Sequence, residues 1–245
     1  MLRRSLFTTL ALVTAATHAD ECATATPAQR PGVVELYTSE GCSSCPPADR
    51  WARALQGRDD LVVAAFHVDY WDRLGWKDPW SDARFSARQH ARAARTGARV
   101  VYTPDVVFDG RSRTDWSRGW TPARTATRAP FDLQVSLARR PSGRLAVHWR
   151  SPDAPATSRA WIAVTESGQS SRPSRGENAG ALLRHAHVVR AYVDDLDATG
   201  GASEIALPVD LGLDRAFVNV VVEDVATARP LHAARLPLAT CRVIE

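Results

Sequence analysis

Lysine and methionine are nearly missing from this chain. Of its 31 basic residues only Lys77 is a lysine, and the chain contains one methionine. The single methionine argues against a methionine-rich copper site, because such sites use soft thioether ligands. We attribute the excess of arginine over lysine to genomic base composition and not to a function.

Excess charge, long apolar runs and nucleotide-binding loops are also scarce. Loss of Arg3 and Arg4 with the N-terminal segment would lower the formal charge of +4 by two, which leaves no reason to expect nucleic-acid binding. Beyond that segment no apolar run is long enough to span a bilayer, and no glycine-rich phosphate-binding loop is present. We therefore expect no nucleic-acid partner, no stable membrane anchor and no cofactor.

The N-terminal segment has the three parts of a secretory signal peptide. Arg3 and Arg4 form its basic region, residues 6–16 form a short apolar run, and residues 17–19 give a small-x-small ending. The acidic residues before Cys22 argue against a lipid-attachment cysteine. We expect residues 1–19 to be a signal peptide and the mature protein to be periplasmic or secreted.

The four cysteines, at positions 22, 42, 45 and 241, allow three disulfide pairings. Disulfides persist in exported proteins, and Cys42 lies close enough in sequence to pair with Cys45. A second bridge, between Cys22 and Cys241, would close nearly the whole mature chain and restrict its unfolded state. The alternative is two free thiols in the terminal tails.

Strand and helix patterns alternate in residues 32–129, after a small, polar, proline-containing segment at 20–31 that is typical of a linker. The order of these patterns, β-α-β-α-β, predicts an α/β layer. The predicted strands are 33–38, 61–68 and 105–108, and the predicted helices are 48–56 and 81–95.

The reactive chemistry of this sequence lies where the first strand meets the first helix. The thiolate is the reactive form of cysteine, and a helix N-terminus stabilises negative charge. In a Cys-x-x-Cys motif one sulfur attacks a partner disulfide and the other resolves the mixed disulfide. We expect Cys42 to be the exposed nucleophile and Cys45 to be the resolving thiol. Two alternatives stay open: half of a zinc site, without a second cysteine pair, and a purely structural disulfide.

Several stretches resemble the DUF1223 family of secreted bacterial proteins, a thioredoxin-like group. The most specific stretch runs from Glu35 to Asp49 and reads ELYTSEGCSSCPPAD. The resemblance covers most of the mature chain and implies a thioredoxin-like fold, while it leaves the biochemical role open. The other matching stretches are 67–72, 74–79, 101–104, 177–178 and 187–191.

The thioredoxin-like resemblance implies roles for two further residues. In that fold a proline before a central strand forms a cis peptide bond beside the Cys-x-x-Cys motif, and Pro104 after Thr103 is the match. The alternative is an ordinary trans proline in a loop. That fold also buries an acid before the motif, and Glu35 resembles it, one residue further from the first cysteine than the pattern expects. Glu35 would either carry a raised pKa and move protons, or face solvent at a strand edge.

The segment 67–80 is unlike a minimal thioredoxin pattern. Period-two alternation places His67 and Asp69 on one face at the C-terminal end of their strand, where sites form in parallel sheets. Either the following aromatic residues form a lid over the cysteine pair, or they pack an inserted loop on the domain, which is the simpler interpretation. These aromatic residues are Tyr70, Trp71, Trp76 and Trp80.

Residues 130–240 change character and predict an antiparallel β-sandwich. His185 and His187 alternate along one strand-like run, but no cysteine or carboxylate stands at ligand spacing, so we do not expect a metal site. The strand-like runs are 131–138, 144–150, 159–166, 185–193, 203–209, 215–223 and 229–236.

Together these patterns predict an α/β thioredoxin-like domain at 32–129 followed by an all-β, sandwich-like domain at 130–240. The leading hypothesis is an exported thiol–disulfide oxidoreductase whose partner is a protein or small-molecule thiol or disulfide. Cys42 would attack, Cys45 would resolve and Pro104 would shape the substrate groove. The alternatives are a binding or structural protein with a static disulfide, and a thiol-based metal handler. The oligomeric state stays open.

Overall fold

The computed structural model describes residues 21–124, 127–140 and 142–241. The expected signal peptide at residues 1–19 lies outside the described residues. Within these ranges the chain is mainly β-structure with two α-helices, α1 (Pro46–Arg53) and α2 (Ala83–Thr96). Short 3-10 helices occur at Asp72–Leu74, Asp115–Arg118, Leu213–Arg215 and Ala239–Cys241.

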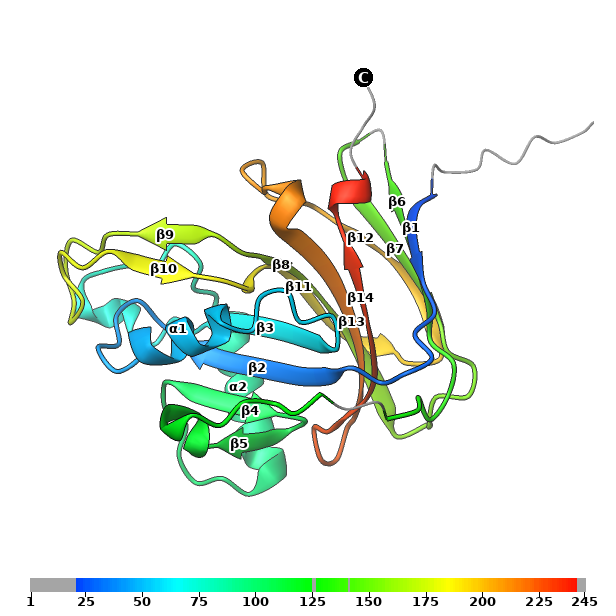
Figure 1. Ribbon diagram of the computed structural model, residues 1–245, viewed down its shortest axis with the longest axis horizontal. Helices are drawn as coiled ribbons and strands as arrows, with labels where there is room; N and C mark the ends of the chain where they lie inside the picture. The colour runs from blue at the N-terminus through cyan, green and yellow to red at the C-terminus, as the bar shows by residue number, and fades with distance from the viewer. Residues whose placement is uncertain (1–20, 125–126, 141, 242–245) are drawn as a thin grey trace, which may run out of the picture.

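The largest element is an eight-stranded sheet in the order β14-β13-β8-β11-β3-β2-β4-β5, which runs through the middle of the molecule (Figure 1). β2 and β3 are parallel, and β11 joins β3 in parallel where Val188 lies beside Ala65. The strands are β2 (Gly32–Thr38), β3 (Leu61–His67), β4 (Asp105–Phe108), β5 (Arg111–Arg113), β8 (Ser158–Glu166), β11 (Val188–Asp197), β13 (Ala216–Asp224) and β14 (Pro230–Pro237).

This sheet shows that the expected fold class, an α/β thioredoxin-like domain followed by a separate all-β domain, is wrong. Both predicted helices and most predicted strands form close to their expected positions, but β8, β11, β13 and β14 extend the sheet of the first half. The physical reason lies at the edge of β3, where the Ala65 amide donates to the His187 carbonyl. A buried strand edge needs hydrogen-bond partners, and the second half of the chain supplies them.

A four-stranded sheet, in the order β1-β6-β7-β12, covers one face of β8, β13 and β14. Ile162 and Val218 of the large sheet pack there in one core with Leu137 and Val147 of the small sheet. β1 pairs with β6, so the segment expected to be a linker contributes a strand. The strands of this sheet are β1 (Glu21–Ala25), β6 (Gln134–Arg139), β7 (Leu145–Arg150) and β12 (Gly200–Ile205).

The two α-helices cover opposite faces of β2 and β3. Leu36 of β2 packs with Ala48 of α1, whereas its neighbour Tyr37 points to the other face and shares a core with Phe85 of α2. Successive residues of a strand point to opposite faces of the sheet. Burial on both faces therefore explains the nearly unbroken apolar run of β3.

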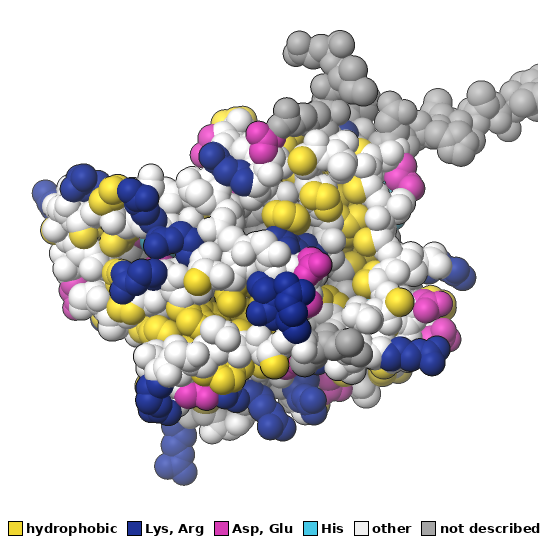
Figure 2. Space-filling model, viewed as in Figure 1, with side chains coloured by type: hydrophobic (Ala, Val, Ile, Leu, Met, Phe, Trp, Pro, Cys, Tyr) yellow, Lys and Arg dark blue, Asp and Glu magenta, His cyan; other side chains and the backbone are white. Residues whose placement is uncertain are grey.

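A disulfide between Cys22 and Cys241 ties β1 to the last 3-10 turn, with the two Cα atoms 4.9 Å apart. The predicted bridge between the ends of the mature chain is confirmed. No helix in the described ranges is long and apolar enough to cross a membrane. Figure 2 shows basic side chains scattered among acidic and apolar ones over one face of the molecule.

A two-stranded hairpin, β9 (Gln169–Ser171) and β10 (Leu183–His185), projects from the large sheet beside α1 (Figure 1). Arg53 of α1 donates a hydrogen bond to the carbonyl of Arg184 in β10. The hairpin brings the loop at 172–182 to the N-terminal end of α1, where the cysteine pair lies.

Candidate functional site

Residues 39–45 connect β2 to α1 and form the cysteine turn. Cys42 and Cys45 are joined by a disulfide with their Cα atoms 5.4 Å apart, which confirms the predicted pairing. Cys45 is the N-cap residue of α1, and prolines fill the next two positions, where a missing N–H costs little. Gly41 allows the turn to close against Trp71, because a Cβ at this position would lie only 2.9 Å from the Trp71 Cβ.

The disulfide of the cysteine turn is buried, which corrects the expectation of an exposed Cys42 nucleophile. Cys42 and Cys45 each expose 0% of their surface, whereas the spacer residues Ser43 and Ser44 are exposed. The physical reason is tertiary, because the segment at Thr103, the 172–182 loop and Trp71 pack around the turn. In this closed form a partner cannot contact either sulfur.

One covering segment carries the predicted cis-proline. The Thr103–Pro104 peptide bond is cis, as predicted. Ser44 Oγ donates to the Thr103 carbonyl at 3.4 Å, and Cys42 Sγ lies 3.3 Å from the same hydroxyl. The Trp71 indole donates to Thr103 Oγ1 at 2.8 Å, so the aromatic loop also supports this contact.

A second covering segment is the 172–182 loop between β9 and β10. The Glu177 carboxylate accepts hydrogen bonds from the Ser43 amide at 2.9 Å and from Ser43 Oγ at 2.7 Å. The Asn178 side-chain amide donates to the carbonyls of Glu40 at 2.8 Å and Cys42 at 2.9 Å. Two residues of the loop therefore hold the backbone on both sides of Cys42.

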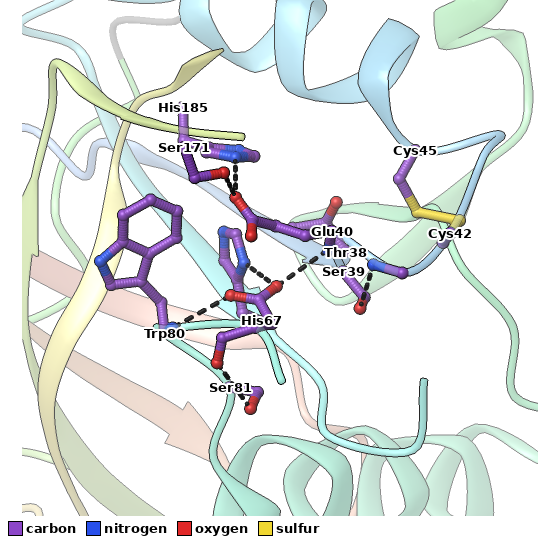
Figure 3. Close-up of polar contacts among 12 residues, drawn as sticks. Thr38, Ser39, Glu40, Cys42, Cys45, His67, Trp80, Ser81, Ser171 and His185 are labelled. Atoms are coloured by element: carbon purple, nitrogen blue, oxygen red, sulfur yellow. Dashed lines mark hydrogen bonds and ion pairs between the residues drawn. A yellow bond between two sulfur atoms is a disulfide. The ribbon is translucent and has the colours of Figure 1, made fainter. Parts of the chain in front are cut away.

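A buried polar cluster lies behind the turn, and Figure 3 shows Glu40 at its centre, between the disulfide and the imidazole of His185. Glu40 Oε1 contacts His185 Nε2 at 3.0 Å and accepts a hydrogen bond from Ser171 Oγ. Its other oxygen accepts from the Trp76 indole at 2.7 Å. Both strands of the β9–β10 hairpin are thus tied to one carboxylate of the cysteine turn.

A second carboxylate and a second histidine complete this cluster. Asp78 Oδ2 accepts from the Glu40 amide at 2.9 Å and lies 2.7 Å from His67 Nδ1. The rings of His67 and His185 meet edge to face with their centroids 5.0 Å apart, and Trp80 packs against both (Figure 3). Among the described residues, His67 Nε2 has no hydrogen-bond partner. Two indoles of the 70–80 segment, those of Trp76 and Trp80, therefore line this cluster.

The charge state of the cluster is set by competition between burial and carboxylates. Burial alone would lower the pKa of His185, but the carboxylates of Asp49 and Glu40 outweigh burial and raise this pKa to about 9. The His185 Nδ1 atom lies 3.7 Å from Asp49 Oδ2, which is an ion-pair distance. Burial alone would raise the pKa of Asp78, but its contact with His67 outweighs burial and lowers this pKa. A cavity of about 150 Å³ between α1 and β10 is lined by Asp49 and His185.

The structure places Glu35 away from this cluster. Its neighbours Val34 and Leu36 pack on the α1 side of the sheet, so Glu35 points to the α2 side. There it accepts hydrogen bonds from Arg88 Nε and the Tyr37 hydroxyl, both at 2.9 Å. Burial would raise the pKa of Glu35, but Arg88 holds it below its ordinary value. Glu35 therefore neither carries a raised pKa nor faces solvent, which were the two alternatives for this residue.

The sequence alone did not identify most of the residues that surround the disulfide. Glu177 and Asn178 stood in a stretch that resembles the family, and His185 was considered only as a metal ligand. His187 lies in a different environment from His185. It is buried beside Arg235, and burial lowers its pKa to about 3. In the part of the chain that the structure describes, no group of three His, Cys, Asp or Glu side chains could hold a metal ion. The residues missed as site residues are Glu40, Asp49, Asp78, Ser171, Glu177, Asn178 and His185.

Comparison with known proteins agrees with this architecture. A family model described as "Protein of unknown function (DUF1223)" matches residues 33–223. A crystal structure of an Agrobacterium tumefaciens protein aligns with 21% identity and a TM-score of 0.61, over 87% of this chain and 97% of that chain. HBP35 of Porphyromonas gingivalis aligns with 15% identity and a TM-score of 0.58, over 87% of this chain and 77% of that chain. No curated protein matches the sequence. At these identities the two structures show similarity of fold alone.

Proposed function

Since this chain belongs to the DUF1223 family, whose description assigns no function, we propose from its own residues that it is a thiol–disulfide exchange protein acting outside the cytoplasm. The observation that carries the proposal is the disulfide between Cys42 and Cys45 at the N-terminus of α1. A helix N-terminus favours the thiolate of a reduced cysteine, which is the form that exchanges. Two disulfides in one chain also suit an oxidising compartment such as the periplasm or the cell exterior.

The proposed exchange proceeds in two balanced steps when a partner is reduced. The Cys42 thiolate attacks one sulfur of a partner disulfide, a mixed disulfide forms, and the other partner sulfur leaves as a thiolate. Cys45 then gives its proton to water and attacks the Cys42 sulfur, which expels the second partner thiolate and closes the Cys42–Cys45 bond. The partner gains two electrons and the protein loses two, and the reverse sequence oxidises a partner dithiol.

The proposal gives a role to Pro104 and none to Glu35, according to their contacts. The Thr103–Pro104 segment borders the turn through the Ser44–Thr103 hydrogen bond, so Pro104 would shape the groove that receives the partner. Glu35 is not given a role in proton transfer, because its buried ion pair with Arg88 holds it ionised on the α2 side of the sheet.

Burial of the disulfide favours a second candidate function, that of a binding or structural protein with a static bond. Neither Cys42 nor Cys45 exposes any surface in the closed turn. Exchange requires that a partner thiolate reach a sulfur along the S–S axis. The two candidates therefore differ in whether the turn opens and reacts under mild reducing conditions.

The test is the reduction potential of each disulfide in the full-length mature protein, equilibrated against glutathione buffers. Alkylation followed by mass spectrometry of the peptides reads the Cys42–Cys45 and Cys22–Cys241 pairs separately, so the second pair is an internal reference. We expect the Cys42–Cys45 pair to have a potential above about −300 mV, the limit typical of structural disulfides. A potential below that limit, with no exchange, would establish the static alternative.

Single cysteine variants check the assigned order of attack. With Cys45→Ser, the remaining Cys42 thiol should form a stable mixed disulfide with a small aromatic disulfide, because no resolving thiol remains. With Cys42→Ser, the same reagent should react at least several times more slowly, because the proposal assigns the resolving role, and not the attack, to Cys45. Equal rates for the two variants would contradict the assignment of Cys42 as the nucleophile.

A further inference from the structure

The 172–182 loop contacts the cysteine turn at backbone groups next to the Cys42 side chain. The Ser43 amide follows Cys42 directly, and the Glu177 carboxylate occupies both this amide and the Ser43 hydroxyl. A hydrogen-bond donor beside a cysteine sulfur favours its charged thiolate form, and a backbone amide is such a donor. In the closed turn, this amide is bound to a carboxylate and is not available to Cys42.

The negative charge of Glu177 acts in the same direction. The hydrogen bonds from Ser43 lower the pKa of Glu177, so its carboxylate is ionised at neutral pH. A negative charge beside the turn disfavours a second negative charge on the Cys42 sulfur. Asn178 adds a mechanical restraint without a charge, because its side chain holds the carbonyls of Glu40 and Cys42.

We propose that Glu177 is a positioning residue that holds the cysteine turn closed and keeps the Cys42 thiol weakly reactive until a partner displaces the 172–182 loop. The inference rests on the proposed exchange function. Glu177 would then act together with the other segments that keep the Cys-x-x-Cys pair buried while its spacer residues are exposed. The loop is anchored at both ends, since Ser171 and His185 both contact the Glu40 carboxylate, so displacement would change the 172–182 loop and leave the hairpin in place.

The experiment measures the Cys42 thiol in protein whose Cys42–Cys45 pair has been reduced with a phosphine. Thiolate absorbance against pH gives the pKa of the thiol, and a small aromatic disulfide gives the rate of reaction. We expect Glu177→Gln to lower the pKa of Cys42 and to raise the rate at neutral pH about threefold to tenfold, the size expected for one partly screened charge. Glu177→Asp should return part of the wild-type pKa, because it restores the charge on a shorter side chain.

Two variants separate the charge of Glu177 from simple opening of the loop. Asn178→Ala removes the restraint and leaves the charge, so it should leave the pKa of Cys42 near that of wild type. Glu204→Gln in β12 removes an exposed carboxylate that pairs with Arg140 and Arg144, and it should change neither measurement. An unchanged pKa in Glu177→Gln, or an equal shift in Asn178→Ala, would overturn the proposal.

The pKa of Cys42 can be measured whether or not the Cys42–Cys45 disulfide exchanges with a partner. If the wild-type pair has the potential of a structural disulfide, the proposed function fails, yet the pKa in phosphine-reduced protein still reports the effect of Glu177. If the pair exchanges readily and Glu177→Gln changes nothing, the function stands and the positioning role is refuted.

Discussion

At the scale of single residues, His185 is the group whose charge most depends on this fold. Its imidazole lies between the carboxylates of Glu40 and Asp49, and its ring packs against Trp80 and His67. In the unfolded chain none of these neighbours is held near it. The proton on His185 is therefore bound more tightly in the folded protein, which links its ionisation to stability.

This linkage predicts that stability falls as pH rises from about 6.5 to about 9. The folded pKa of His185 is raised from 6.5 to about 9, so its contribution is complete below the unfolded value and is lost as pH passes through the folded value. The rise corresponds to about 3 kcal/mol of unfolding free energy. Thermal unfolding of wild type and His185→Gln across this range should show a difference that shrinks with rising pH.

His187 is the matched control for that measurement. Burial lowers the pKa of His187 to about 3, so this histidine is uncharged throughout the range. His187→Gln should change the level of stability and leave its slope against pH as in wild type. A wild-type slope in His185→Gln would contradict the role given to the His185 charge.

At the scale of elements, α2 connects the two halves of the large sheet through Arg88. The Arg88 guanidinium pairs with Glu35 of β2 and with Glu223 of β13, each at 2.9 Å. It also lies over the ring of Trp161 at 4.7 Å. Strands that are far apart in sequence are thus tied to one helix by one side chain.

We expect Arg88→Met to lower the free energy of unfolding by about 3–5 kcal/mol, because the change removes an ion-pair partner from two buried carboxylates. Glu223 keeps its pair with Arg95, whereas Glu35 keeps only the hydrogen bond from Tyr37. The midpoint of urea unfolding measures the loss. Arg84→Met is the control on the same helix, since Arg84 pairs with Asp82 at an exposed position and should contribute about 1 kcal/mol or less. Equal losses in the two variants would contradict the contribution to stability that we assign to the Arg88 ion pairs.

At the scale of the whole molecule, the Cys22–Cys241 disulfide restricts the chain far more than the Cys42–Cys45 disulfide does. The first pair is 219 residues apart in sequence and the second is three apart. The stabilisation from a cross-link grows with the length of the loop that it closes. The Cys22–Cys241 disulfide is therefore expected to contribute more to stability through the unfolded chain than the Cys42–Cys45 disulfide does.

We expect the double variant Cys22→Ala/Cys241→Ala to lose about 2–5 kcal/mol of unfolding free energy. Cys42→Ala/Cys45→Ala, which opens only a short loop, should lose clearly less. Urea unfolding of both variants without reductant makes the comparison. A larger loss from the short pair would mean that packing of the cysteine turn outweighs the chain entropy of the long loop.

The sequence by itself determined the features that depend on neighbouring residues. The apolar run at 61–68 predicted β3 and the cysteine spacing predicted the Cys42–Cys45 bond, whereas the cis bond before Pro104 was expected only from the thioredoxin-like resemblance. Hydrophobic period, turn residues and short spacings act over a few residues, so they are visible in the sequence.

The tertiary structure decided which segments meet. It joined Val188 to Ala65 and so made one sheet of two expected domains. It brought Glu177 to Ser43 across 134 residues and His185 to Glu40 across 145 residues. Such contacts depend on which strand edge pairs with which, and on side chains from distant elements that share one buried space. A local pattern carries neither kind of information. The segments that bury the cysteine turn, and the charged side chains around it, are therefore seen only in the folded chain.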